Sequence, residues 1–211
     1  MKQIASDLWQ SEPYHPFPYL KTQCYLLMTS TGNILFYNTG LDDEFSEIEK
    51  KGGYTTHCLS HRHESSEKIT KLKQRFKAKL VCEKTEAEAF ALQCTTDIFI
   101  TERTTLESGV IAIPTPGHTS GGCCYFYQSP HNERYLFTGD LFYVTNNNLS
   151  TFVYSPDGGS QQALIDSLGT LYDYEPSWVL SSAFEGDSSS LPMEPSIWRQ
   201  EIERNIATLK S

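Results

Sequence analysis

Segments with strand-like alternation and segments with helical periodicity follow one another along this chain in two successive halves. In the first half, strands are predicted at residues 23–29, 33–37, 56–60 and 79–82, and helices at residues 43–51, 65–76 and 85–92. In the second half, strands are predicted near residue 98 and at residues 110–113, 122–128, 134–138 and 178–182, and helices at residues 161–172 and 195–210. Residues 142–159 are expected to be irregular. Two such halves predict an α/β fold in which two sheets pack together and helices flank them.

The length and composition fit one folded domain. The chain has 211 residues, of which 38% are hydrophobic and 12% aromatic, so it can bury a substantial core. Because no linker-like segment divides it, we expect a single domain over residues 1–211.

Charge and apolar patterning exclude several classes of function. The formal net charge is −9, whereas a protein that binds the phosphates of nucleic acids needs a basic surface. No apolar run reaches the roughly 18–20 residues of a membrane span, and the first residues lack the apolar segment of a signal peptide. We therefore expect a cytoplasmic protein that acts on a small molecule and binds neither nucleic acid nor membrane.

The chain contains six cysteines, and none belongs to a Cys-x-x-Cys pair. In a reducing compartment such residues act as small buried hydrophobes rather than as disulfides or metal ligands. We expect this of Cys24, Cys58, Cys82, Cys94, Cys123 and Cys124.

Three short motifs place side chains that can bind a metal next to predicted strands. His61 and His63 follow the strand at residues 56–60, and residues two apart in extended backbone project to the same side. His118 lies in a turn rich in proline and glycine, which restricts its position. Asp140 follows Thr-Gly at the end of the strand at residues 134–138, where a carboxylate can reach a sheet edge.

The order of these motifs, a strand ending in HxH, then TPGHT, then TGD, resembles the metallo-β-lactamase-fold hydrolases, and the glyoxalase II-like members most of all. Residues 33–40 (NILFYNTG) are similar to the early strand and turn of that family, which usually reads Asp-Thr-Gly. The resemblance runs from about residue 23 to residue 182. It implies a four-layer αββα sandwich with the site at one edge of the two sheets.

The chain also departs from the family pattern and carries a degenerate HxHxDH motif. Residues 61–66 read HRHESS, so Ser65 and Ser66 stand in place of its aspartate and last histidine. Asn38 replaces the early aspartate, and residues 180–184 lack the late histidine. In the family the missing groups hold a second metal, and the missing aspartate also orients the attacking water. The groups that remain match the ligands of the first metal: His61, His63, His118 and Asp140.

This remaining set predicts one divalent metal rather than two. Three imidazoles and one carboxylate form a suitable four-ligand set for zinc. Alternatively, the three histidines hold zinc together with a water, and Asp140 acts as the catalytic base or orients that water. The subset His61, His118 and Asp140 would suit iron(II), and a site that binds no metal at all also stays open. Glu64 is expected to begin a helix, where it complements the helix dipole, rather than to bind a metal.

Aromatic segments are candidates for the wall of a substrate pocket. His15 lies in a rigid aromatic loop at residues 13–19, and Tyr143 and Tyr154 lie in the segment after Asp140. We predict that these three side chains line the pocket. The same aromatic residues would also suit the interface of a homodimer.

Three functions fit this reading of the sequence. The favoured one is a metal-dependent hydrolase with one metal and weak or specialised activity on a small ester, thioester or lactone. Each lost catalytic group costs a factor of about 10² to 10⁴ in rate, which is why slow hydrolysis is expected. The second is a non-catalytic member, a pseudoenzyme that binds a ligand or a partner. The third is a mononuclear iron dioxygenase, because the persulfide dioxygenases of the family resemble part of this ligand set.

Overall fold

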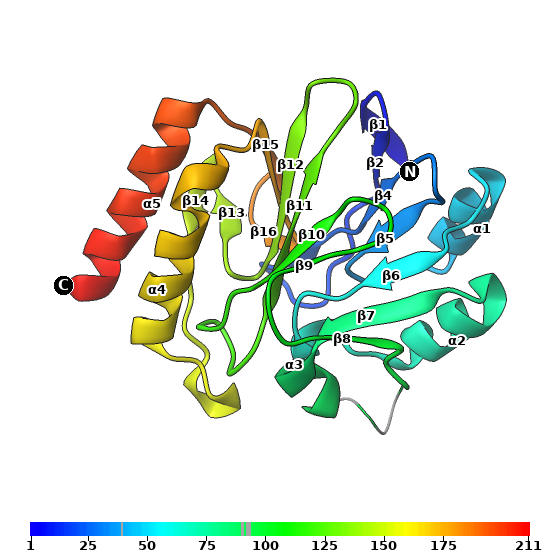
Figure 1. The fold of residues 1–211 in the computed structure, drawn as a ribbon, viewed down its shortest axis with the longest axis horizontal. Coiled ribbons are helices and arrows are strands. Elements are labelled where there is room, and N and C mark those ends of the chain that lie inside the picture. Colours follow the sequence, from blue (N-terminus) through cyan, green and yellow to red (C-terminus); the bar gives the residue numbers. More distant parts are fainter. Residues whose placement is uncertain (39, 90, 92–93) are drawn as a thin grey trace.

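Two large β-sheets pack face to face in the computed structural model of this protein, which describes residues 1–38, 40–89, 91 and 94–211 (Figure 1). In spatial order the first sheet contains β1 (Lys2–Ala5), β2 (Leu8–Gln10), β4 (Tyr25–Leu27), β5 (Ile34–Phe36), β6 (Thr56–Cys58), β7 (Lys79–Glu83) and β8 (Ile98–Ile100). The strands from β5 to β8 run parallel to one another. Their carboxyl ends therefore share one edge of the sheet.

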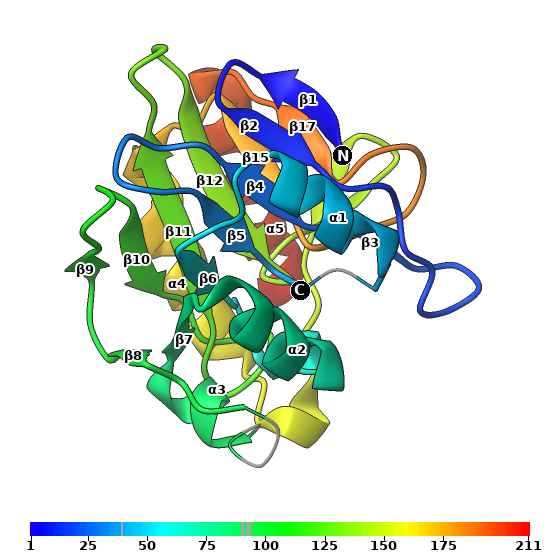
Figure 2. The same ribbon diagram turned by 90° about the vertical axis from the view of Figure 1, so that its right-hand side faces the viewer.

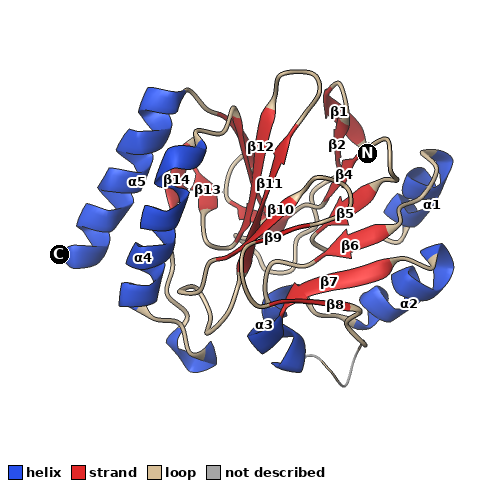
Figure 3. Ribbon diagram, in the orientation of Figure 1, coloured by secondary structure: helices blue, strands red, loops and turns tan. Residues whose placement is uncertain are grey.

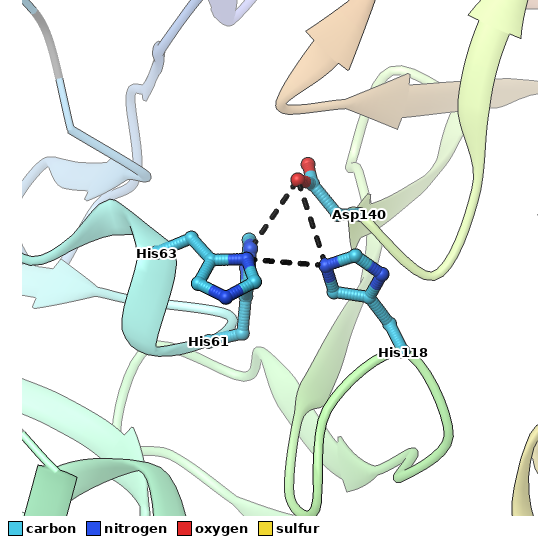
Figure 4. A group of neighbouring side chains, drawn as sticks. All are labelled: His61, His63, His118 and Asp140. Atoms are coloured by element: carbon cyan, nitrogen blue, oxygen red, sulfur yellow. Dashed lines mark hydrogen bonds and ion pairs between the residues drawn. The ribbon is translucent and has the colours of Figure 1, made fainter. Parts of the chain in front are cut away.

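The second sheet contains, in spatial order, β17 (Ser190–Pro192), β15 (Trp178–Ser181), β12 (Arg134–Gly139), β11 (Cys123–Gln128), β10 (Ile111–Pro114) and β9 (Thr104–Thr105). β12 and β15 pair in parallel, and the other pairs of this sheet are antiparallel. The parallel pair ends at the same edge of the sandwich as β6, and that edge holds the site described below (Figure 4).

Helices cover the outer face of each sheet (Figure 3). α1 (Asp43–Lys50) and α2 (Glu67–Phe76) lie on the first sheet, and α3 (Lys84–Ala89) lies beside the end of β7. α4 (Gln161–Leu171) and α5 (Pro195–Lys210) lie on the second sheet. The predicted four-layer αββα sandwich, a single domain over the whole chain, is confirmed.

Alternation along the strands explains how two cores form on the two faces of one sheet. In β12, Tyr135 and Phe137 belong to the core between the sheets, whereas Leu136 belongs to the core under α4 and α5. Phe137 stacks on Phe36 of the first sheet with ring centroids 3.6 Å apart. The pleat of β12 therefore places Asp140, the residue after the strand, at the boundary of the two sheets.

A small third sheet differs from the prediction that residues 142–159 are irregular. It contains β14 (Asn148–Ser150), β13 (Tyr143–Thr145), β16 (Ala183–Phe184) and β3 (Lys21–Thr22) in that order. Asn146 and Asn147 form the turn between β13 and β14, with φ of 50° and 62°. Two successive positive φ values are typical of a tight hairpin turn, in which asparagine is favoured. The turn signal was present in the sequence, but the strands on either side were too short to predict.

The other predicted elements appear with small shifts at their ends, and the N-terminal hairpin of β1 and β2 was not predicted at all. The helix expected at residues 85–92 is observed as α3, and residues 90, 92 and 93 lie outside the described residues. All six cysteines are buried thiols, as expected. Within the described part of the chain, no helix is long and apolar enough to cross a membrane.

Candidate metal centre

Four side chains from three segments converge at the carboxyl edge of the two sheets (Figure 4). His61 and His63 follow β6, His118 follows β10, and Asp140 follows β12. One ligand atom from each of these residues lies within 4.8 Å of all the others. The structure therefore brings together all four residues that the sequence motifs indicated as metal ligands.

The atoms that face the centre of this cluster are two Nε2 atoms, one Nδ1 atom and one carboxylate oxygen. His61 Nε2 lies 3.3 Å from Asp140 Oδ2, and His118 Nε2 lies 3.9 Å from the same oxygen. His63 Nδ1 lies 3.3 Å from His118 Nε2. Such spacings bring the lone pairs of three imidazoles and one carboxylate to a common point.

The outward nitrogen of His61 contacts a buried polar pair. His61 Nδ1 lies 2.9 Å from Ser60 Oγ and 3.5 Å from Glu64 Oε1. Glu64 also accepts hydrogen bonds from the backbone N–H and the hydroxyl of Ser60. Glu64 was expected to begin the following helix, but it lies in the short 3₁₀ turn Arg62–Glu64, and its carboxylate turns inward beneath His61. Ser66 caps α2 instead, accepting from Lys68 N.

The outward nitrogens of the other two imidazoles are held by one segment, residues 151–159. Asp157 Oδ2 lies 2.6 Å from His63 Nε2, and the carbonyl of Phe152 lies 2.8 Å from His118 Nδ1. A partner on one ring nitrogen fixes the tautomer and the ring orientation, which leaves the other nitrogen as an acceptor. Each histidine of the cluster therefore directs its inward nitrogen to the common point.

The electrostatics of the cluster favour one added positive charge. Burial lowers the pKa of His61, but the charges and hydrogen bonds of Asp140 and Glu64 outweigh this effect and raise that pKa to about 10. Burial raises the pKa of Asp140, yet the neighbouring His61 and His118 hold it well below its usual range. Burial and the charge of His61 lower the pKa of His118.

The donor set fits a divalent metal of the zinc type. His61 Nε2 is buried, and it faces Asp140 Oδ2 at 3.3 Å. Three imidazole nitrogens and one carboxylate oxygen suit zinc, copper or iron, whereas magnesium and calcium prefer all-oxygen sites. His61, His63, His118 and Asp140 are the residues that could hold such an ion.

Comparison with known proteins agrees with this architecture. The profile of the metallo-β-lactamase superfamily matches residues 95–182, which include His118 and Asp140. The chain is similar to the metallo-β-lactamase superfamily over this segment, which is under half of its length. Among curated proteins, it is 26% identical over 115 residues to the probable polyketide biosynthesis zinc-dependent hydrolase PksB of Bacillus subtilis (strain 168). That match covers 53% of this chain and 47% of PksB, so the chain spans about half the length of its curated relative.

Solved structures with the metallo-β-lactamase fold cover almost the whole chain. A metallo-β-lactamase from Pontibacter korlensis has a TM-score of 0.73 at 17% identity, with 100% of this chain and 98% of that chain covered. A metallo-β-lactamase from Cronobacter sakazakii, described by its HARLDQ motif, has a TM-score of 0.67 at 16% identity and covers 95% and 96%. At such identities, the likeness demonstrates the fold alone.

A cavity of about 930 Å³ is lined in part by the four residues of the cluster. Tyr143 and Tyr154 line it, whereas His15 is exposed and is not among the lining residues. Its neighbours Tyr14 and Phe17 line the cavity instead, from the loop that follows β2 and projects from the body of the fold (Figure 2). Neighbouring residues of an irregular loop point in different directions, which the sequence alone cannot resolve.

Three serines and an alanine also line the cavity and form what we call its serine side: Ser65, Ser66, Ser182 and Ala183. The hydroxyl of Ser182 donates to Asp140 Oδ1, the carboxylate oxygen that does not face the histidines. Ser66 Oγ accepts from Asn38 Nδ2 at 2.6 Å. Within the described residues, the four-residue cluster is the one group of histidine, cysteine and acidic side chains with a metal-binding arrangement.

Sequence reasoning missed the residues that orient the ligands. Ser60, Glu64 and Asp157 support histidines through their side chains, and Phe152 does so through its backbone carbonyl. The position of Ser60 and Glu64 within three residues of His61 was an available signal. No signal in the sequence pointed to Asp157, which is 94 positions from His63.

Proposed function

We propose that this protein is a metal-dependent hydrolase that uses one divalent metal, preferably zinc, to cleave a small ester, thioester or lactone. The observation that carries the proposal is the convergence of His61 Nε2, His63 Nδ1, His118 Nε2 and Asp140 Oδ2 within 4.8 Å. Each outward imidazole nitrogen has a partner, so the inward nitrogens are oriented before an ion arrives.

The chain's own residues supply three parts of the chemistry. The three histidines bind the ion, and a divalent metal held there would lower the pKa of a bound water and polarise a carbonyl oxygen. Asp140 Oδ2 faces the same point and either completes the ligand set or accepts a hydrogen bond from the attacking water. The burial of His61 and His118 strengthens the electrostatic interactions at this point.

The serine side of the cavity floor supports one metal rather than two. The Ser182 hydroxyl donates a hydrogen bond to Asp140 Oδ1. Ser66 Oγ accepts hydrogen bonds from the backbone N–H of Lys68, which caps α2, and from Asn38 Nδ2. Neutral hydroxyls bind zinc poorly compared with thiolates, imidazoles and carboxylates. Without a second ion, we expect slow turnover or a preference for activated substrates.

The lining of the cavity supports a substrate with an apolar part of moderate size. Its volume falls within the range of small-molecule sites, and Tyr14, Phe17, Tyr143, Phe152 and Tyr154 face into it. These aromatic rings offer flat surfaces for an acyl chain or a ring, and the polar cluster at the base would receive the scissile carbonyl.

A non-catalytic role is the second candidate, and one specific observation favours it. The raised pKa of His61 means that a proton already supplies the positive charge that Asp140 and Glu64 require. A protonated cluster could therefore be stable without any metal, as in a pseudoenzyme that binds a ligand or a partner through the same cavity.

Metal content per chain tests the proposal. The protein would be purified without a metal-binding tag, analysed for its elements, and assayed with matched thioester and lactone substrates before and after chelation. About one zinc per chain, with hydrolysis lost on chelation and restored by zinc, is the expected result. About one iron per chain would revive the dioxygenase hypothesis, and no metal after incubation with zinc would favour the non-catalytic role.

A further inference from the structure

We infer that Glu86 is a positioning residue that connects the two histidine-bearing loops and thereby sets the metal affinity of the cluster; this inference rests on the proposed function. His61 and His63 lie on one loop and His118 lies on another, more than fifty positions later. An ion that binds all three requires these loops to keep a fixed separation. Glu86, on α3, contacts both of them.

The contact with the first loop runs through Arg62, the residue between the two histidines. Glu86 Oε2 accepts from the backbone N–H of Arg62 at 2.7 Å and from its Nε at 3.0 Å. Glu86 Oε1 accepts from Arg62 Nη2 at 3.0 Å. This is a two-pronged guanidinium–carboxylate pair with an additional backbone bond, which fixes distance and orientation together.

The contact with the second loop runs through the residues just after His118. Glu86 Oε1 accepts from Thr119 Oγ1 at 3.1 Å and from the backbone N–H of Gly121 at 2.8 Å. Arg62 Nη2 also reaches this loop and donates to Ser120 Oγ at 2.6 Å. One carboxylate thus accepts five hydrogen bonds, three from the first loop and two from the second.

Glu86 is tightly enclosed, so these hydrogen bonds would break if the two loops moved apart. Glu86 is completely buried. A Cβ added at Gly121 would lie 2.8 Å from Glu86 Cγ, so glycine is required there for the loop to approach. Burial raises the pKa of Glu86, but the bonds from Arg62 and Gly121 outweigh it and lower that pKa. Breaking the hydrogen bonds to this buried carboxylate would cost substantial free energy, because neither water nor another side chain could take the place of the lost donors.

Glu86 touches none of the inward-facing ligand atoms, so its effect on a metal is indirect. Groups that orient metal ligands typically change metal affinity about 10–100-fold when they are removed. We therefore expect Glu86→Gln, which keeps the shape of the side chain but loses the charge, to weaken zinc binding by a factor in this range.

The experiment measures the zinc dissociation constant of the full chain by competition with a chromophoric chelator, and the absorption spectrum of the cobalt(II) form. The matched control is Asp7→Asn, which alters another buried carboxylate. Asp7 accepts from Ser129 Oγ and Tyr135 OH between the sheets, away from the cluster. Thermal unfolding of both metal-free variants reports their general loss of stability.

The expected result is weaker zinc binding and an altered cobalt spectrum in Glu86→Gln, with both properties unchanged in Asp7→Asn. Unchanged zinc affinity in Glu86→Gln, when the wild type binds zinc, would overturn the role of Glu86 but not the proposed function. No zinc binding by the wild type would overturn both. If Glu86→Gln fails to fold, Arg62→Lys removes the two-pronged contact and keeps the charge, and it must show the same weakening.

Discussion

The two sides of the cavity floor use their polar side chains in different ways. On the histidine side, His61, His63 and His118 each have a partner on the outward nitrogen and direct the inward nitrogen to a common point. On the serine side, the Ser66 hydroxyl caps α2 and the Ser182 hydroxyl donates to Asp140 Oδ1, so both hydroxyls are already engaged. The comparison shows that a metal-ligand side chain needs a hydrogen-bond partner on its outward atom and a second donor atom directed to the common point.

The largest expected effect is on the histidine side. His118→Ala and His61→Ala each remove an inward nitrogen, and each should abolish stoichiometric zinc binding measured by elemental analysis. The control is His131→Ala, because His131 is exposed in the hairpin loop between β11 and β12. Full zinc content in either cluster variant would show that the histidine side is not the metal site.

The next effect is the pH dependence of zinc binding. Because metal-free His61 keeps its proton up to a pKa of about 10, zinc must displace that proton at neutral pH. The zinc dissociation constant should therefore fall about tenfold per pH unit from pH 7 to pH 9. Asp140→Asn removes the carboxylate that raises the pKa of His61 most, so this pKa should be lower in the variant. The zinc dissociation constant should then stop falling at a lower pH than in the wild type. A flat profile in the wild type would contradict the charge balance described above.

The same pKa has a consequence for stability. The pKa of His61 in the folded protein lies above its unfolded value of 6.5, so its contribution to the stability of the metal-free protein is complete below that pH. It is lost as the pH rises through about 10. Chemical denaturation of metal-free wild type and His61→Gln should differ most at pH 6 and converge above pH 10. Curves that stay equally far apart at all pH values would exclude this account.

A smaller effect is expected from the group behind His63. Asp157→Asn should raise the zinc dissociation constant about tenfold, at the lower end for groups that orient a metal ligand. Asp157 and His63 are one third exposed, and solvent weakens their interaction. Asp166→Asn is the matched control, since Asp166 is an exposed carboxylate on α4. Equal zinc affinity in both variants would show that Asp157 does not orient His63 for metal binding.

The smallest effect tests the serine side. The double variant Ser65→Asp, Ser66→His should still bind one zinc per chain, because Ala183 leaves the late ligand position without a donor. It should lose about 1 kcal/mol of unfolding free energy, because Ser66 no longer caps α2. Ser66→Ala is the control for the cap. Adding Ala183→His should be required for a second zinc, and two zincs in the double variant would contradict this comparison.

The sequence was most informative where a metal-binding side chain directly follows a run of apolar residues typical of a strand. The strands that form the sheets contain apolar runs, and the four cluster residues follow such runs directly, so their convergence could be predicted from order and spacing. The same reasoning misjudged Glu64, because the position of a carboxylate near a helix start does not reveal which way the side chain turns.

Other parts of the site depend on contacts that no local pattern encodes. Phe152 contributes a backbone carbonyl, which every residue possesses, and Asp157 reaches His63 only because residues 151–159 fold back over the sheet edge. Glu86 was one of several glutamates in a charged helix, and only its burial sets it apart. Long-range positions of this kind require the tertiary structure.

The contacts between the two sheets fix them at both ends of β12. At the cavity end, the Tyr37 hydroxyl donates to Leu180 O at 2.6 Å and accepts from Gly139 N at 2.9 Å. At the opposite end, Asp7 holds Tyr135 OH at 2.6 Å and Ser129 Oγ at 2.7 Å. The Tyr37 contacts lie next to the cluster, because Gly139 directly precedes Asp140, and they set the distance between His61 on the first sheet and Asp140 on the second. The Asp7 contacts stabilise the far end of the sandwich and leave that distance unchanged.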